Sequence, residues 1–201
     1  MLFNTAKKIC SSVLFASSAL SLLLITPVAM AGQLDFSRKL TAPDGAAEDY
    51  FGYSVALDGN LALVGTYGDD DNGTTSGSAY LFDTATGSLL HKFLAPDGDR
   101  WDYFGYSVAL EGNLALIGAW GDDDGSVGNR GSAYLFDTTT GSLIQKFLAP
   151  DSTGTEHFGY SVTLDGNQAL IGAINDDDNG DGSGSAYLFD TTTGSFLQKF
   201  V

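Results

Sequence analysis

Cysteine is almost absent from this sequence, and basic residues are scarce. The single cysteine, Cys10, lies in a leader that we expect to be removed, so the remaining chain can form no internal disulfide. Only 9 Lys and Arg residues accompany 25 Asp and Glu residues, and the formal net charge is −16. Such a chain repels nucleic acid and anionic lipid and favours metal cations or basic partner surfaces.

The usual enzyme motifs are missing as well. The chain has no G-x-x-x-x-G-K-S/T phosphate loop, and neither serine nor histidine occurs in a nucleophile-elbow setting. Two histidines, His91 and His157, cannot by themselves form a histidine-rich metal site. These absences argue against several common classes of enzyme.

The first 31 residues have the pattern of a secretory signal peptide. Lys7 and Lys8 precede a mostly apolar stretch, 13–28, which leads to small residues at Ala29 and Ala31. An uncleaved membrane anchor is the alternative, although the uncharged run is only marginally long enough for the ~20 residues of a spanning helix. We therefore expect residues 32–201 to be secreted (extracellular, periplasmic or at the cell surface), with no membrane attachment after cleavage.

An internal repeat dominates residues 32–201. Phe51, Phe104 and Phe158 each open the sequence FGYSV, and the following residues keep in step. The three copies span about 39–91, 92–145 and 146–198. Repeats this similar predict equivalent structures.

Each copy contains four short apolar runs separated by turn sequences. In the first copy the runs are 53–57, 61–66, 78–82 and 88–94. Asp58-Gly59-Asn60 joins the first two runs and a longer loop, 83–87, joins the last two, as in antiparallel hairpins. Several runs are apolar on both faces, which predicts sheets that are covered on both sides. The sequence therefore predicts an all-β fold of β-propeller type with three tandem four-stranded antiparallel blades.

The motifs of the copies resemble the FG-GAP repeat, with FG followed by SVAL, then VG or IGA, then GSAYLF, over residues 39–201. The resemblance implies the kind of blade that builds the seven-bladed propeller of integrin α chains and occurs in many bacterial surface proteins. It also implies that the first strand lies nearest the axis and the fourth at the rim. In integrins a calcium loop joins the first two strands, whereas here that connection is the short 58–60, 111–113 or 165–167. The integrin calcium site is therefore not carried over.

Three blades are fewer than the four to eight of closed propellers. Residues 33–40 resemble a further rim strand, because 38–44 parallels 145–151. Three arrangements stay open here: an open arc, a six-bladed ring made by two chains, and a part of a longer protein. An exposed strand edge and an apolar blade face favour a partner, so a homo-oligomer is one expectation.

Aspartates cluster in the loop between the second and third runs of every copy. Adjacent carboxylates repel each other, and Ca²⁺ held by oxygen ligands relieves this repulsion. A solvated loop that only adds solubility is the alternative, and Leu188 stands where an EF-hand has its last glutamate. The candidate calcium ligands are Asp69, Asp70, Asp71, Asp122, Asp123, Asp124, Asp176, Asp177, Asp178, Asn179 and Asp181.

Aromatic residues accompany these acidic loops. Trp101 and Trp120 occur only in the second copy, and they are candidates either for binding a sugar or a protein or for packing within the loops. An acid and an aromatic residue precede each FG, which favours a structural role over a binding role because the pair recurs in every copy. These pairs are Asp49-Tyr50, Asp102-Tyr103 and Glu156-His157.

Together these features predict a secreted, non-enzymatic binding or adhesion module that recognises a protein or a glycan through its acidic loops, assisted by calcium. The alternative hypothesis is a structural element that completes a propeller by self-association. A glycan-active enzyme is a third hypothesis, which fits less well because near-identical blades lack the differentiated residues that a catalytic pocket needs.

Overall fold

A computed structural model of the chain describes residues 38–123 and 128–201. The chain divides into two units, Met1–Ser37 and Arg38–Val201, and all described residues belong to the second. The predicted signal peptide and Asp124 therefore lie outside the described residues. Within the described ranges, no helix is long and apolar enough to cross a membrane.

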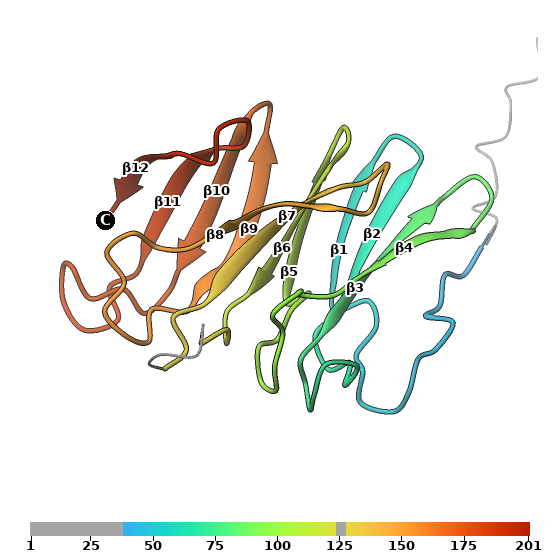
Figure 1. Ribbon diagram of the computed structural model, residues 1–201, viewed down its shortest axis with the longest axis horizontal. Coiled ribbons are helices and arrows are strands. Elements are labelled where there is room, and N and C mark those ends of the chain that lie inside the picture. The colour runs from blue at the N-terminus through green and yellow to red at the C-terminus, as the bar shows by residue number, and fades with distance from the viewer. Residues whose placement is uncertain (1–37, 124–127) are drawn as a thin grey trace, which may run out of the picture. The chain divides into compact units, whose positions relative to one another are not determined.

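The described residues form three four-stranded antiparallel sheets, one for each repeat, and contain no helix (Figure 1). The first sheet comprises β1 (Ser54–Asp58), β2 (Leu61–Thr66), β3 (Ser78–Asp83) and β4 (Leu89–Phe93). The second comprises β5 (Ser107–Glu111), β6 (Leu114–Ala119), β7 (Ser132–Asp137) and β8 (Leu143–Phe147). The third comprises β9 (Phe158–Asp165), β10 (Gln168–Ala173), β11 (Ser185–Asp190) and β12 (Phe196–Phe200). Strands follow one another in chain order within each sheet, which confirms the predicted blades.

The first hairpin of each sheet is formed by the predicted turn. Asp58 pairs with Leu61, so only Gly59 and Asn60 connect β1 to β2. Gly59 has a φ of 54°, the left-handed conformation that a two-residue hairpin turn requires. A longer connection at this point, such as a calcium loop, has no place in this register.

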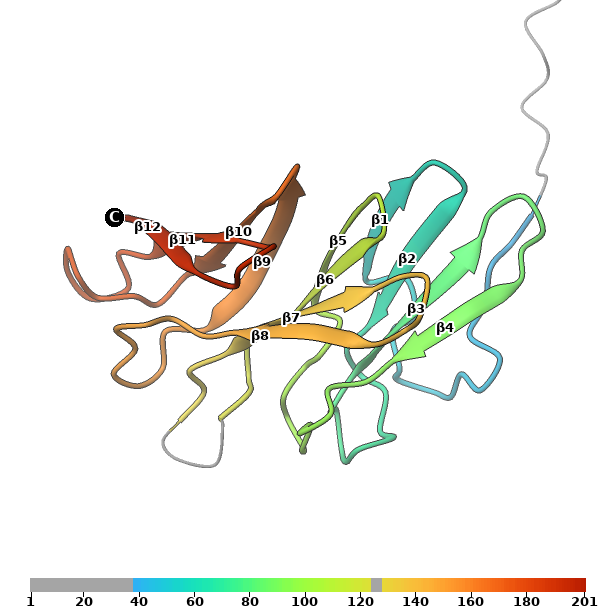
Figure 2. The same cartoon turned by 45° about the horizontal axis from the view of Figure 1, so that its top comes forward.

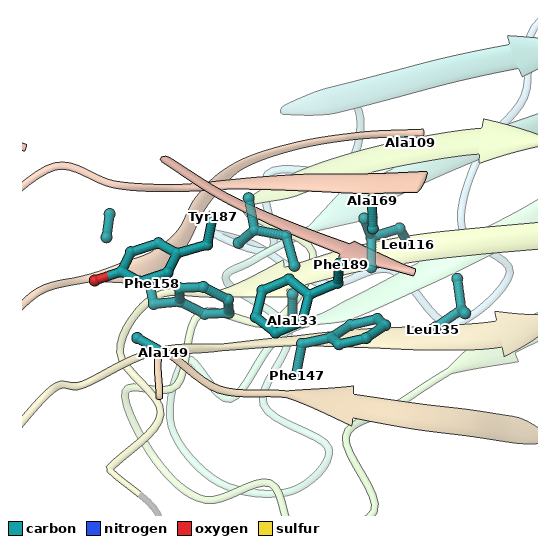
Figure 3. Close-up of a cluster of buried hydrophobic side chains, with 12 residues drawn as sticks. Ala109, Leu116, Ala133, Leu135, Phe147, Ala149, Phe158, Ala169, Tyr187 and Phe189 are labelled. Carbon is teal, nitrogen blue, oxygen red and sulfur yellow. The ribbon is translucent and has the colours of Figure 1, made fainter. Parts of the chain in front are cut away.

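The hydrophobic cores lie between neighbouring sheets. Leu63 and Leu81 of the first sheet share one buried cluster with Ile117 and Tyr134 of the second. A second cluster joins the second sheet to the third and includes the aromatic rings labelled in Figure 3. The middle sheet is therefore covered on both faces, which explains why β6 and β7 are apolar at successive positions.

Neighbouring sheets approach each other closely where two glycines meet. A Cβ atom on Gly65 would lie 2.0 Å from the carbonyl oxygen of Gly105, which belongs to the FGYSV sequence of the next repeat. The Ser54 hydroxyl donates a hydrogen bond of 2.7 Å to the same oxygen. Ser107 repeats this bond to Gly159 at 2.8 Å. The glycine and the serine of FGYSV thus join each sheet to its neighbour.

The sheets form an open series (Figures 1 and 2). On the outward face of the first sheet Val55 and Leu57 are 67% and 74% exposed, although their counterparts Val108 and Leu110 pack between sheets. Leu40 covers another part of this outward face. Of the predicted rim strand 33–40 the structure describes only 38–40, and these residues are not in a strand.

Candidate functional site: the link end

One end of the Arg38–Val201 unit carries the irregular connections. It consists of the loops after β2, β6 and β10 and of the segments that lead into β1, β5 and β9 (Figure 1). We term it the link end; the tight hairpin turns form the opposite end. The described candidate aspartates and both tryptophans lie at the link end.

A lysine from the fourth strand lies at the centre of the first aspartate cluster. Lys92 Nζ is 2.7 Å from carboxylate oxygens of Asp44 and Asp71 and 3.0 Å from Asp69. The Tyr80 hydroxyl donates hydrogen bonds to Asp44 (2.8 Å) and Asp69 (2.9 Å). The ammonium group also lies 5.1 Å from the centre of the Tyr80 ring, within the range of a cation–π interaction. Lys92 and Tyr80 thus connect the loop after β2, the segment before β1 and the fourth strand, β4.

The same arrangement recurs in the other two sheets. The third cluster joins Lys199 to Asp151, Asp176 and Asp178 at 2.6–2.8 Å. The second joins Lys146 to Asp97 and Asp122, both at 2.7 Å. Three copies with one geometry indicate that the lysine is a structural part of the repeat.

These contacts keep the clusters ionised. Burial alone would raise the pKa of Asp176, but hydrogen bonds from Lys199 and Tyr187 outweigh it and lower the pKa to about 2. The pKa of Asp69 is also lowered, because its hydrogen bonds outweigh its burial. Conversely, burial would lower the pKa of Lys92, but the surrounding carboxylates raise it above its usual value.

The middle aspartate of the first and third loops has a different role. Asp70 accepts a hydrogen bond of 2.7 Å from the Thr75 N–H, and Asp177 accepts one of 2.7 Å from the Gly182 N–H. Both close their own loop. The remaining described candidates, Asp123, Asn179 and Asp181, are exposed.

The residues present do not fit a calcium site. In each cluster the ammonium group lies 2.6–2.7 Å from a carboxylate among the candidate calcium ligands, namely Asp71, Asp122 or Asp178. Among residues 38–123 and 128–201, no group of three or more His, Cys, Asp or Glu side chains could hold a metal ion. Repulsion among the aspartates, on which the calcium prediction rested, is relieved by Lys92, Lys146 and Lys199 instead. Calcium binding stays an untested prediction from the sequence, and the lysine contacts argue against it.

The acidic residue before each FG accepts hydrogen bonds that close a turn in the segment leading into the first strand of its sheet. Asp49 accepts a hydrogen bond from the Ala46 N–H, and Asp102 accepts one from the Asp99 N–H at 2.7 Å. Glu156 accepts a bond of 2.6 Å from the Ser152 hydroxyl and others from backbone N–H groups. These contacts support the structural interpretation of the recurring pair.

Asp102 differs from Glu156 in its acidity. Burial raises the pKa of Asp102 to about 7, and repulsion by neighbouring aspartates adds to the effect of burial. In Glu156 the hydrogen bonds outweigh burial and lower the pKa. The segment that leads into β5 thus holds a carboxyl group, that of Asp102, which titrates near neutral pH.

Aromatic side chains form a continuous row across the link end. Tyr53 contacts Tyr106 and Tyr106 contacts Tyr160, both with ring centres 4.9 Å apart. Trp120 stacks on Tyr103 with ring centres 4.4 Å apart and an interplanar angle of 5°. The row links successive sheets, so Trp120 serves in packing, whereas Trp101 is 50% exposed.

A cavity of about 310 Å³ opens at the link end between the first and second sheets. Its walls combine exposed aromatic rings with two carboxylates. The side chains that define it are Tyr50, Tyr67, Trp101, Tyr103, Glu48 and Asp70. The cavity was not predicted from the sequence, because its residues come from two links and the loop between them.

Comparison with known families identifies the repeat. The family model for the FG-GAP repeat matches residues 35–82, 88–136 and 142–189, more than half of the chain. The chain belongs to the FG-GAP repeat family. Each match ends in the third strand of one sheet, and the second and third matches begin just before β4 and β8, the fourth strands of the preceding sheets. Repeats of this kind indicate a binding or structural module.

Comparison of this FG-GAP chain with curated proteins gave no match. Among solved structures it is similar to the crystal structure of the Saccharomyces cerevisiae Sqt1, with a TM-score of 0.50 and 19% sequence identity. The match covers 74% of this chain and 35% of that chain, so it spans about a third of the length of Sqt1. At this identity the likeness concerns the fold alone.

Proposed function

We propose that this FG-GAP unit is an exported, non-enzymatic binding module that takes a partner at its link end. The observation that carries the proposal is the cavity between the first two sheets, where Tyr50 and Trp101 are 55% and 50% exposed. Large aromatic side chains give much contact area at a small loss of conformational freedom, which makes them frequent anchors in binding surfaces.

The charge of the chain favours a protein partner with a basic surface. The formal net charge is −16, and two of the residues that define the cavity are Glu48 and Asp70. Electrostatic attraction accelerates the encounter with a positively charged partner. A glycan that stacks on Trp101 is the other ligand class that this surface can accept.

The lysine clusters support the proposal because they hold the binding surface in place. Lys92 joins β4 to the loop after β2 and to the segment before β1. A surface fixed before binding loses less entropy when the partner arrives. The proposed binding needs no calcium, since the positive charge in each cluster comes from the chain itself.

Binding to a panel of immobilised basic proteins, acidic proteins and polysaccharides tests the proposal. Trp101→Ala at the link end should weaken binding of the recognised ligand at least tenfold. Ile144→Ala, which removes another exposed apolar side chain on β8, is the control and should bind normally. Equal binding by wild type and the Trp101 variant would show that the link end is not the binding surface. Turnover of any polysaccharide would contradict the non-enzymatic assignment.

Self-association is a second candidate function. The exposed Val55 and Leu57 of the first sheet favour it, because their counterparts are covered by the next sheet. The outward face of the third sheet is mixed. Thr163 and Gln168 are exposed where the earlier repeats have alanine and leucine, as is typical of terminal repeats that face water, whereas Phe200 is 46% exposed although its counterparts Phe93 and Phe147 are buried. Because the two polar residues weaken this face as an apolar interface, we expect light scattering at micromolar concentration to give a monomer, whereas a stable dimer would favour assembly as the function.

A further inference from the structure

The walls of the link-end cavity face in several directions. Tyr50 and Tyr67 are parallel, with ring centres 5.1 Å apart and an interplanar angle of 4°. Tyr103 is tilted by 48° to Tyr67, and Trp101 is tilted by 48° to Tyr103. A single sugar ring is best matched by one flat platform, whereas these rings border a concave space. Their π faces carry partial negative charge.

Two carboxylates add full negative charge to this space. Glu48 is exposed, and its side chain makes no hydrogen bond or ion pair with any described residue. Asp70 uses Oδ1 to accept the Thr75 N–H. Among the described residues that line the cavity there is no Lys or Arg, and Arg100, next to Trp101 in the chain, is not one of them. No described side chain that lines the cavity therefore neutralises its negative charge.

One backbone position at the cavity has a conformation that the third repeat does not share. Glu48 and Trp101 occupy equivalent positions in successive links, and both have left-handed φ angles, 71° and 72°. Their counterpart in the third link, Thr155, does not share this conformation. A left-handed residue other than glycine costs on the order of 1 kcal/mol, and such residues concentrate at ligand sites. Each link has one further left-handed residue, Tyr50, Tyr103 or His157, so what sets the two links at the cavity apart is the second such residue, Glu48 or Trp101.

From these observations we infer that the cavity binds an alkylammonium cation carried by the partner. Aromatic faces and carboxylates around one space are the chemistry that recognises organic cations. The volume of about 310 Å³ lies at the lower end of ligand cavities, which suits a single headgroup or side-chain terminus. This inference rests on the proposed function, because it names the group that the link end recognises.

Isothermal titration of the protein with choline and with Nα-acetyl-lysine amide tests the inference at low salt. We expect millimolar binding of a cation and at least tenfold weaker binding of 3,3-dimethyl-1-butanol, which has the shape of choline without its charge. Stronger binding of choline identifies a quaternary ammonium group, and stronger binding of the lysine derivative identifies a basic side chain. Either result supports the inference. If neither choline nor the lysine derivative binds more strongly than the neutral alcohol, the inference is overturned.

Variants with a matched control locate the site. Glu48→Gln and Asp70→Asn should each weaken cation binding by about threefold to tenfold. Asp177→Asn removes the equivalent aspartate of the third loop, which accepts a hydrogen bond of the same length but does not line the cavity, so its binding should equal that of the wild type. Thermal melting of each variant confirms that it is folded. Wild-type affinity in both Glu48→Gln and Asp70→Asn would overturn the inference.

A neutral glycan separates failure of the inference from failure of the proposed function. If a neutral oligosaccharide binds, quenches Trp101 fluorescence and is unaffected by Glu48→Gln, the alkylammonium inference is wrong and binding at the link end stands. If the panel ligand binds equally well to Trp101→Ala, the proposed function itself is wrong.

Discussion

The ammonium group of Lys92 lies 3.0 Å from the carboxylate of Asp69, a side chain that is only 6% exposed. Lys92 is on β4, and Asp69 is in the loop after β2 of the same sheet. The contact recurs between Lys146 and Asp122 and between Lys199 and Asp176. A buried carboxylate without a positive partner is strongly unfavourable. The lysine therefore allows an aspartate-rich loop to fold against the sheet.

Replacing the lysine should destabilise the fold. Lys92→Met keeps most of the stem and leaves Asp69 without its cation, so we expect a loss of about 2–3 kcal/mol in the free energy of unfolding. Lys39→Met is the matched control, because Lys39 aligns with Lys92 in the repeat but is exposed and has no ion pair with a described residue. Urea unfolding measures both. Equal stability of the two variants would contradict the structural role of the cluster.

The serine of FGYSV should stabilise only the sheets that have a following neighbour. Ser54→Ala removes a bond of 2.7 Å to the Gly105 carbonyl, which should cost about 1 kcal/mol. Ser161→Ala makes the same change in the third sheet, where no later sheet provides an acceptor among the described residues, and should cost almost nothing. A similar loss in both variants, measured by thermal unfolding, would show that the hydrogen bond between sheets is not the cause.

Because the second and third sheets lie close together, Gly118 should not tolerate a side chain. A Cβ atom on Gly118 would lie 2.0 Å from the Gly159 carbonyl oxygen, so Gly118→Ala should force the second and third sheets apart and cost about 3 kcal/mol. Gly172→Ala is the counterpart in the third sheet, where the close atom is Oγ of Ser161, which can rotate away. Calorimetry should therefore give Gly118→Ala a much lower melting temperature than Gly172→Ala. Equal melting temperatures would contradict this packing.

Asp102 should make stability fall as the pH rises from about 4 to about 7. Its pKa is about 7 in the folded protein and about 3.9 in the unfolded chain, so the folded state binds more protons in this window. Asp102→Asn cannot ionise, and its amide oxygen can still accept the Asp99 N–H. We expect the stability difference between pH 5 and pH 8 to be smaller by about 2 kcal/mol in the variant than in the wild type.

Asp165→Asn, which replaces an exposed aspartate at the hairpin end, is the control for the loss of one carboxylate from the chain. The lysine-paired aspartates do not confuse the measurement. The pKa values of Asp69 and Asp176 are lowered, so the contribution of these two residues is lost only as the pH falls below about 4. Parallel pH profiles of wild type and Asp102→Asn would show that Asp102 titrates normally.

The blades could be predicted from the sequence because their signals are local and repeated. FGYSV recurs at the first strand of each copy, and Asp58-Gly59-Asn60 fixes the register of the first hairpin within a few residues. Runs that are apolar on both faces indicated stacked sheets, as the buried β2 and β3 confirm.

The lysine clusters and the cavity were missed because they depend on contacts distant in sequence. Lys92 lies 48 residues from Asp44, and only the folded sheet brings the two together. The recurrence of lysine before phenylalanine at the end of every fourth strand, as in Lys92-Phe93, was the available signal. No comparable signal marked the cavity, since the left-handed conformation of Glu48 and Trp101 is not encoded by glycine.

Calorimetric melting of the protein in EDTA and in 5 mM calcium tests most directly whether the lysines take the place of metal ions. We expect the two melting temperatures to agree within about 1 °C, because the positions among the carboxylates are taken by Lys92, Lys146 and Lys199. A calcium site with a dissociation constant of about 10⁻⁴ M would instead add about 2 kcal/mol and raise the melting temperature by roughly 4–8 °C. A rise of that size would contradict the account of the link end given above.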